Sequence, residues 1–330
     1  MSWFNHVFQL INALQAAEVS PESISSIVGV REAHLSIQDG DLRKIKGTKK
    51  VEALSLDLRQ TESHRSCFTN EEFEQLQNLR FLLLDGADLD GDFKRLFSKL
   101  RWLQWRGCPV YFKPINFHLK NLVILDLSNS RITNNWEGWS QLKMAKRLKV
   151  LDLSNCSHLV QSPEFSTFAK LEKLILQGCP NLVQIDRSIG NLRNLRVLDI
   201  AYSGITKLPD VIGNLEKLEE MNASSCRKLQ GEILSDIGRL SSLRILRLCD
   251  SEIRSLPTSI CGLSCLQSLH LYNCKQLRLL PKLPPNLKRL DVSSCVSLEG
   301  LPDLSQLGVL EELDLCGCQK LVSVNGLWGF

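Results

Sequence analysis

The chain has 330 residues, of which 43% are hydrophobic and 23% are charged. This balance excludes an intrinsically disordered chain, and no apolar run reaches the roughly 18 residues that mark a membrane-spanning helix. With 40 basic and 36 acidic residues, the net charge of +4 is too small an excess for a dedicated nucleic-acid binder.

Residues 1–46 contain four of the 61 Leu in the chain and match no repeat, so this segment has no domain assignment. Its place before the repeats suggests an N-terminal cap, and Gly29–Ile37 predicts one strand. The first ten residues lack the basic start of a secretory signal. We therefore expect the cytoplasm or the nucleus, where the 12 Cys would stay reduced.

Most of the other 57 Leu follow one pattern, Leu-x-x-Leu-x-Leu-x-x-Cys/small-x-x-Leu. Eleven copies start 21 to 26 residues apart, within the range of leucine-rich repeats. We number the positions in each copy from its first Leu, which is position 0. The copies start at Leu79, Leu100, Leu122, Leu148, Leu171, Leu195, Leu218, Leu243, Leu266, Leu287 and Leu310.

This spacing predicts the architecture of residues 47–330. Leu at positions +3 and +5 alternate with period two, so they enter the core from a short strand. The strands of successive copies then stack in parallel on the concave side of an α/β solenoid. The fold class is a leucine-rich-repeat horseshoe of about 11 to 12 repeats, with short helical or irregular segments on the convex side.

Both ends of the array depart from the pattern. Val51–Leu58 has the strand signature of an earlier copy and is followed by an insertion over Thr61–Asn70. After Leu310 no polar cap is recognisable, although solenoids need one. We therefore expect the leucine-rich-repeat domain to be truncated and to continue beyond Phe330.

Seven Cys share position +8, where the remaining copies have Ala or Ser. A small, weakly polar side chain that turns inward at the end of the strand predicts a structural ladder through the array. Cys261/Cys265 and Cys316/Cys318 resemble pairs of metal ligands, but four zinc ligands at compatible spacing are lacking. Cys249 and Cys316, at position +6, are the candidates for reactive thiols. The predicted ladder comprises Cys108, Cys156, Cys179, Cys226, Cys274, Cys295 and Cys318.

The sequence contains no phosphate-binding loop, dinucleotide fingerprint, nucleophile elbow or zinc-protease motif. A column of Asp at position +4 invites comparison with paired catalytic carboxylates, but a polar consensus position explains it better. We expect no enzymatic activity, no cofactor and no metal. The column comprises Asp126, Asp152, Asp199, Asp291 and Asp314.

Positions +2, +4, +6 and +7 are where the concave side would meet a partner. Aromatic and Arg side chains anchor protein interfaces, and basic and acidic residues are mixed at these positions, which favours a protein partner over nucleic acid. For Trp102, burial beneath a cap is an equal alternative. The predicted protein-binding residues are Trp102, Gln104, Arg106, Arg247, Asp250, His270, Tyr272, Arg289 and Asp291.

Several stretches resemble the leucine-rich-repeat region of plant intracellular immune receptors that carry a TIR domain and a nucleotide-binding module, rust-resistance proteins among them. In that family the TIR domain cleaves NAD and the central module binds ADP or ATP. Neither region is recognisable here, so we expect ADP or ATP to bind only through a domain outside this sequence. The similar stretches are Gly47–Leu58, Phe73–Leu84, Leu100–Pro109, Asn121–Ser128 and Leu280–Leu290.

The resemblance implies a non-catalytic recognition module of plant defence. It would bind a pathogen effector or a host protein and help to keep the nucleotide-binding module inactive. A general intracellular scaffold or adaptor, such as the substrate-binding array of a ubiquitin ligase or phosphatase, is the alternative, although no F-box-like segment precedes the repeats. A bacterial effector with a ligase domain is a weaker alternative, because only Leu280–Leu290 resembles its repeats.

Overall fold

The computed structural model describes residues 34–37, 51–58, 66–94, 96–112, 117, 119–232, 235–324 and 326. The chain forms two compact units. Unit 1 comprises Met1–Leu127 and Glu137–Ala145, and unit 2 comprises Ser128–Trp136 and Lys146–Phe330.

The main sheet of unit 1 consists of parallel strands that follow one another in chain order. The side chains at position +3 share one row, in which Leu54 pairs with Leu82 and Leu103 pairs with Leu125. The strands predicted within Gly29–Ile37 and Val51–Leu58 are confirmed, so the sheet includes residues of the unassigned segment. These strands are β1 (His34–Ile37), β2 (Ala53–Asp57), β4 (Phe81–Asp85), β6 (Trp102–Arg106) and β7 (Ile124–Asp126).

Unit 1 has a second parallel sheet, formed by β3 (Ser66–Thr69) and β5 (Ala87–Asp90). The short helix α3 (Asn70–Phe73) follows β3 directly. The insertion predicted over Thr61–Asn70 therefore contains regular structure in its second half. Apolar packing accounts for this regular structure. Phe68 and Phe73 are buried, and their rings meet edge to face with centroids 6.5 Å apart.

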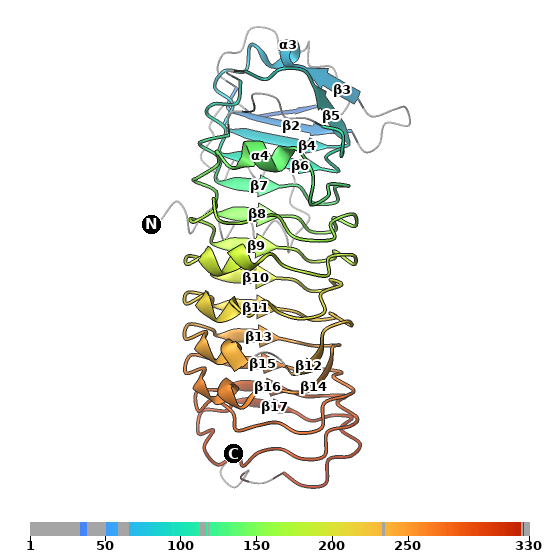
Figure 1. Ribbon diagram of the computed structural model, residues 1–330, viewed down its shortest axis with the longest axis vertical. Helices are drawn as coiled ribbons and strands as arrows, with labels where there is room; N and C mark the ends of the chain where they lie inside the picture. Colours follow the sequence, from blue (N-terminus) through green and yellow to red (C-terminus); the bar gives the residue numbers. More distant parts are fainter. Residues whose placement is uncertain are drawn as a thin grey trace. The chain divides into compact units, whose positions relative to one another are not determined.

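The strands of unit 2 are also parallel and in chain order, and Figure 1 shows them stacked one above the other. Position +3 again forms one row, from Leu151 through Met221 to Leu313. The strands are β8 (Val150–Asp152), β9 (Lys173–Ile175), β10 (Val197–Asp199), β11 (Glu220–Asn222), β13 (Ile245–Arg247), β15 (Ser268–His270), β16 (Arg289–Asp291) and β17 (Glu312–Asp314).

The core of each copy is a thin layer of aliphatic side chains. In the copy that begins at Leu195, the side chains of Leu195, Leu198 and Ile200 are all completely buried. Burial of one such side chain stabilises a fold by about 1.5–3 kcal/mol. Since neighbouring copies supply the walls of each layer, stability depends on contacts between copies.

Short helical turns carry the chain back to the next strand. Two of their glycines allow neighbouring turns to touch through the backbone: a Cβ at Gly213 would lie 2.6 Å from the carbonyl oxygen of Asp236, and one at Gly238 would lie 2.5 Å from that of Ser259. The return segments include α4 (Gly138–Leu142), η2 (Arg187–Asn191), η3 (Ile212–Asn214), η4 (Ser235–Arg239), η5 (Thr258–Gly262) and the two-stranded sheet of β12 (Gln230–Glu232) with β14 (Glu252–Ser255).

Position +7, which we call the corner, has a left-handed backbone in all eleven copies, with φ between 53° and 75°. Only Gly adopts this conformation freely, and Asn and Asp tolerate it better than other residues do. The corner turns position +8 into the core. The corner residues are Gly86, Gly107, Asn129, Asn155, Gly178, Tyr202, Ser225, Asp250, Asn273, Ser294 and Gly317.

Replacement of a corner glycine tests this requirement. We expect Gly178→Ala to lower the free energy of unfolding by about 1–2 kcal/mol, because φ is +70° and the new Cβ would collide with the Asn155 side chain. Urea unfolding followed by circular dichroism measures the change. Gly308→Ala is the matched control, because no atom lies within 4 Å of its added Cβ. Equal effects of the two substitutions would contradict the prediction.

Candidate protein-binding surface

The register of unit 2 brings four predicted residues together on the side of the sheet that carries positions +2 and +4, which we call the concave face. Arg247 of β13 pairs with His270 of β15, which in turn pairs with Asp291 of β16. Arg289 lies two residues before Asp291 on the same strand and therefore on the same face. The parallel register thus assembles a polar group from residues up to 44 positions apart in the sequence.

Both Arg side chains of this group form ion pairs with the neighbouring strand. Arg247 lies 3.8 Å from Glu220, and Arg289 lies 3.1 Å from Glu312. The four side chains are 39% to 64% exposed, so each pair contributes at most about 1 kcal/mol. Neither Glu was predicted to belong to the surface. The sequence feature that could have indicated them is an acidic residue at position +2 of the copy next to that of each Arg.

The imidazole of His270 is half-buried between these charges. Burial lowers its pKa, and Arg247 and Arg289 lower it further, while Asp291 acts in the opposite direction. The ring is therefore mainly neutral at pH 7 and presents one donor and one acceptor nitrogen.

Side chains of the Asp column at position +4 accept hydrogen bonds from the backbone. The N–H of position +6 donates to the carboxylate of its own copy, at 2.8 Å in Asp152, 3.0 Å in Asp199 and 3.0 Å in Asp291. Asn222 accepts the equivalent bond at 3.1 Å. An amide can replace the carboxylate in this role, so the column favours a structural function over catalysis.

Two predicted residues lie just beyond the strands. Tyr272, at position +6, is 43% exposed and available to a partner. Asp250 is a corner residue, and its Oδ1 accepts a hydrogen bond of 2.5 Å from Nδ2 of Asn273. Asp250 thus links neighbouring copies as well as facing solvent.

The three remaining predicted residues form a group of their own on β6 of unit 1. Trp102 is only 7% exposed. Of the two predictions for this residue, the structure therefore agrees with a buried side chain and not with an exposed anchor. Gln104 and Arg106 are half-buried. The guanidinium of Arg106 lies 3.6 Å from Asp126 and 4.0 Å from Asp85, which holds it against the strands.

The sequence did not indicate a buried lysine on the concave face. Lys173, at position +2 of β9, is 7% exposed, and burial lowers its pKa, while Asp152, Asp199 and Glu220 raise it. Burial in turn raises the pKa of Asp199. The only available signal was a Lys at a position that neighbouring copies fill with Val150 and Val197.

Five of the seven cysteines predicted for the ladder bond to the copy before their own, whereas Cys108 bonds to Pro109 at 3.8 Å and Cys156 bonds to Ser154 at 3.9 Å within their own copies. Sγ of Cys179 donates to the carbonyl oxygen of Leu153 at 3.2 Å, and Sγ of Cys226 donates to that of Ile200 at 3.1 Å. Cys274, Cys295 and Cys318 repeat this bond to position +5 of the preceding copy, at 3.1 to 3.2 Å. The thiols thus act as hydrogen-bond donors along the stack.

The environment of these thiols affects their pKa values in different directions, because a hydrogen bond with Cys295 lowers the pKa of Cys274, whereas burial keeps Cys179 and Cys226 protonated. Burial raises the pKa of Cys179 from 9.0 to about 11 and also raises that of Cys226. The two candidates for reactive thiols are also poorly activated, because burial raises the pKa of Cys249 and a hydrogen bond with Asp314 raises that of Cys316. A raised pKa lowers the fraction of reactive thiolate.

Most copies belong to one of two types, which differ in the residue that follows the ladder position. In five of the seven copies with Cys at the ladder position, a buried Leu follows three residues later, as in Cys179 to Leu182, whose N–H donates to the Cys179 carbonyl at 3.0 Å. Copies with Ser reach a buried Ile after two residues, as in Ser203 to Ile205. Within the described residues, the Ser type at Ser251 continues directly into β14.

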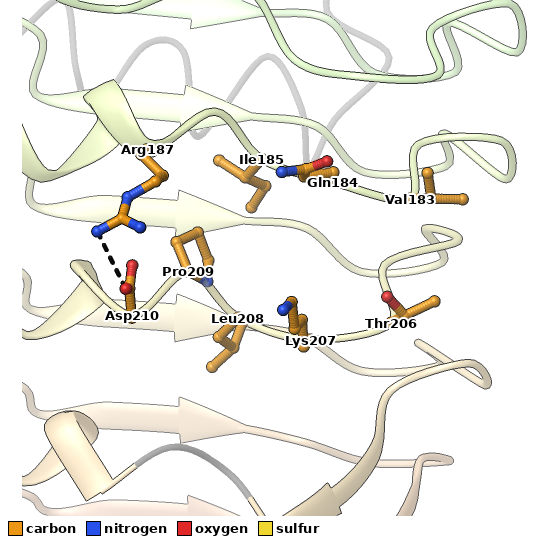
Figure 2. Close-up of a pocket in the computed structure, with 9 residues that line it drawn as sticks. All are labelled: Val183, Gln184, Ile185, Arg187, Thr206, Lys207, Leu208, Pro209 and Asp210. Atoms are coloured by element: carbon orange, nitrogen blue, oxygen red, sulfur yellow. Dashed lines mark ion pairs between the residues drawn. The ribbon is translucent and has the colours of Figure 1, made fainter.

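The return segments of two adjacent copies line a groove of about 550 Å³ in unit 2 (Figure 2). Its floor is apolar, with Ile185, Leu208 and Pro209 buried. At one end Arg187 and Asp210 form an ion pair of 3.0 Å that neutralises both charges.

Over the described parts of the chain, no group of three or more His, Cys, Asp or Glu is arranged to hold a metal ion. In the same residues no helix has the length and apolar character needed to cross a membrane.

Comparison with known proteins shows which fold the chain has. A family model described as Zer-1-like leucine-rich repeats matches residues 139–224. A leucine-rich-repeat protein of Leptospira interrogans superposes with a TM-score of 0.58 at 20% identity, covering 94% of this chain and 88% of that one. A TDR receptor superposes with a TM-score of 0.54 at 21% identity, covering 81% and 56% of the two chains. The chain therefore has the leucine-rich-repeat fold.

The curated relatives are plant disease resistance proteins. RPV1 of Vitis rotundifolia is 34% identical over 175 residues, which is 44% of this chain and 12% of that protein. RPS6 of Arabidopsis thaliana is 28% identical over 294 residues, or 84% and 25% of the two chains. RPP4 of the same plant is 30% identical over 281 residues, or 78% and 24%. The chain thus spans a quarter or less of the length of these relatives.

The raised pKa of Cys179 predicts a pH dependence of stability. The unfolded thiol loses its proton near pH 9, while the folded one keeps it to about pH 11, so its contribution is complete below pH 9 and is lost as the pH rises through 11. We expect the free energy of unfolding to fall over this range, by roughly 2–3 kcal/mol from Cys179 alone. Urea unfolding at a series of pH values measures it.

Cys179→Ala isolates this effect from the other groups that titrate in the same range. The variant should be less stable than the wild type at pH 8 and should lose less stability between pH 9 and 11. An identical pH profile for the two proteins would refute the assignment. Cys261→Ala, at an exposed thiol, is the control and should change neither quantity.

Proposed function

We propose that the chain is a non-catalytic recognition module of a plant immune receptor. It binds a pathogen effector or a host protein on the concave face of β13–β16, and in the receptor it contributes to autoinhibition of the nucleotide-binding module. On this proposal the receptor is of the TIR type and acts in the cytoplasm or the nucleus. ADP or ATP would bind to that other module and not to the repeats.

One observation supports this proposal most: the register places Arg247, His270, Arg289 and Asp291 side by side on one face, with Tyr272 at its margin. Arg and Tyr are the residue types that dominate protein interfaces. The ion pairs to Glu220 and Glu312 hold both Arg side chains in place before a partner arrives, which lowers the entropy lost on binding.

The similarity to disease resistance proteins supports the biological context of the proposal. It extends over 84% of the chain in RPS6, and so includes strands of both units. A general scaffold or adaptor shares the fold and would also bind protein, so the discriminating experiment must measure the partner and not the fold.

A double substitution on the concave face tests the binding proposal. We expect Arg247→Glu with Tyr272→Ala to weaken binding of a pathogen effector at least about tenfold while leaving the circular dichroism spectrum unchanged, because both side chains are partly exposed. Isothermal titration calorimetry against a panel of purified effectors provides the affinity.

Lys207→Glu is the matched control, since it also reverses one exposed positive charge of unit 2 but lies on a return segment in the groove of Figure 2. It should leave effector affinity within twofold of the wild type. If the double variant binds as the wild type does, the concave face is not the binding surface. If no effector binds and a host ubiquitin ligase or phosphatase subunit does, the adaptor function replaces the proposed one.

A further inference from the structure

Two neighbouring members of the ladder, Cys274 and Cys295, form a buried pair of thiols. They belong to copies whose strands, β15 and β16, pair in parallel register. Each Sγ donates to the carbonyl oxygen at position +5 of the preceding copy, Cys274 to Leu248 at 3.2 Å and Cys295 to Leu271 at 3.1 Å. The two sulfur atoms therefore occupy equivalent places one copy apart in the same column.

Side chains of neighbouring ladder positions lie in contact. Oγ of Ser251 lies 3.5 Å from Sγ of Cys274, and Oγ of Ser203 lies 3.3 Å from Sγ of Cys226. A hydrogen bond joins the side chains of Cys274 and Cys295 in the same way. No other side chain therefore has to move out of the way for these two sulfur atoms to meet.

The backbone spacing of the sheet is compatible with a disulfide at this place. Adjacent strands lie about 4.8 Å apart, and the Cα atoms of a disulfide usually lie about 4.4–6.8 Å apart. The Cβ atoms of a disulfide lie closer, at about 3.8 Å, so the bond would draw the two corners together and would be strained. Strained disulfides are easily reduced, as regulatory ones are.

The two thiols differ in acidity. The hydrogen bond with Cys295 lowers the pKa of Cys274, although burial acts in the opposite direction. The same hydrogen bond raises the pKa of Cys295, and burial raises it further. A reactive dithiol needs this difference, because one sulfur attacks as the thiolate while the other keeps its proton until the bond closes.

Other thiols of the ladder lack this combination. Cys226 lies between Ser203 and Ser251, so neither adjacent copy offers a second thiol. Cys156 and Cys179 belong to adjacent copies, but Cys156 bonds within its own copy and burial raises the pKa of Cys179. These sites serve as internal controls.

We propose that Cys274 and Cys295 form a reversible disulfide, which hydrogen peroxide closes and a low-molecular-weight thiol opens. Sγ of Cys274 attacks one peroxide oxygen, so that an S–O bond forms, the O–O bond breaks, and a sulfenic acid and one water result. Sγ of Cys295 then attacks Sγ of Cys274, so that the S–S bond forms, the S–O bond breaks, and the hydroxyl leaves with the Cys295 proton as a second water. Two electrons pass from the thiols to the peroxide.

Peroxide reaches the pair from the corners. Both thiols are completely buried, but the residues that directly precede them, Asn273 and Ser294, are partly exposed. Opening of one corner therefore admits a molecule as small as hydrogen peroxide. Such local openings require less free energy than unfolding of the whole chain does.

The bond would act on the proposed binding surface. The copies that it joins carry His270 on β15 and Arg289 on β16, so drawing their corners together changes the spacing of these side chains. This effect rests on the proposed function, whereas formation of the bond depends on no partner.

Oxidation of the full chain tests the proposal. The protein is treated with hydrogen peroxide, free thiols are blocked, and chymotryptic peptides are analysed by mass spectrometry without reduction. We expect a cross-link between Cys274 and Cys295 that is at least about tenfold more abundant than one between Cys156 and Cys179. Dithiothreitol should remove it.

Two variants identify the chemistry. Cys295→Ser should abolish the cross-link and leave Cys274 as a sulfenic acid that dimedone labels. Cys226→Ser is the matched control and should leave the yield of the cross-link within about twofold of the wild type, because Cys226 has no thiol neighbour. Both variants should fold, as circular dichroism would show, since Ser occupies the ladder position in other copies.

The proposal would be overturned if the cross-link is absent at a peroxide dose that oxidises the exposed Cys261, or if Cys156–Cys179 or Cys295–Cys318 cross-links form equally well. Effector affinity of the oxidised and reduced chains separates the bond from the proposed function. If the bond forms and affinity is unchanged, its effect on the binding surface is excluded. If no effector binds either form, the proposed function fails while the mass spectrum still decides whether the bond exists.

Discussion

The structure depends on the left-handed corner that ends each strand. A parallel strand must turn sharply to bring the next side chain into the core, and a residue with φ between 53° and 75° accomplishes this turn in every copy. In five copies the thiol of the next residue then reaches the carbonyl oxygen at position +5 of the preceding copy, as Cys226 reaches Ile200 at 3.1 Å. The corner thus fixes the direction of the chain and the link between copies at the same time.

The sequence predicted the parts of the fold that repeat. Leu at positions +3 and +5 specify a strand with one buried face, and because each copy has the same pattern, they also specify the parallel register that aligns Leu198 with Leu174 and Met221. The strand at His34–Ile37 was recognisable by the same alternation. The inward position of the Cys at +8 followed from its alternation with Ala and Ser.

Features specific to one copy were harder to predict. Whether position +2 is exposed depends on the side chains around it, so the burial of Lys173 and of Trp102 had no reliable sequence signal. The pairing of Arg289 with Glu312 depends on which rotamers reach across the register, which spacing alone does not determine. The left-handed corner itself was not recognised as a column, although Gly and Asn recur in it.

The contacts between helical turns have a consequence for how such an array changes length during evolution. Gly213 of η3 faces the carbonyl oxygen of Asp236 in η4, and Gly238 of η4 faces that of Ser259 in η5, so η4 offers a carbonyl on one side and a glycine on the other. A duplicate of the copy that contains η4 brings both halves of this contact with it. The new junction is then chemically the same as the one it interrupts, so recombination between whole copies lengthens the array without disturbing its packing. A transplanted copy that lacks the glycine would push its neighbour away, which restricts the copies that can be exchanged.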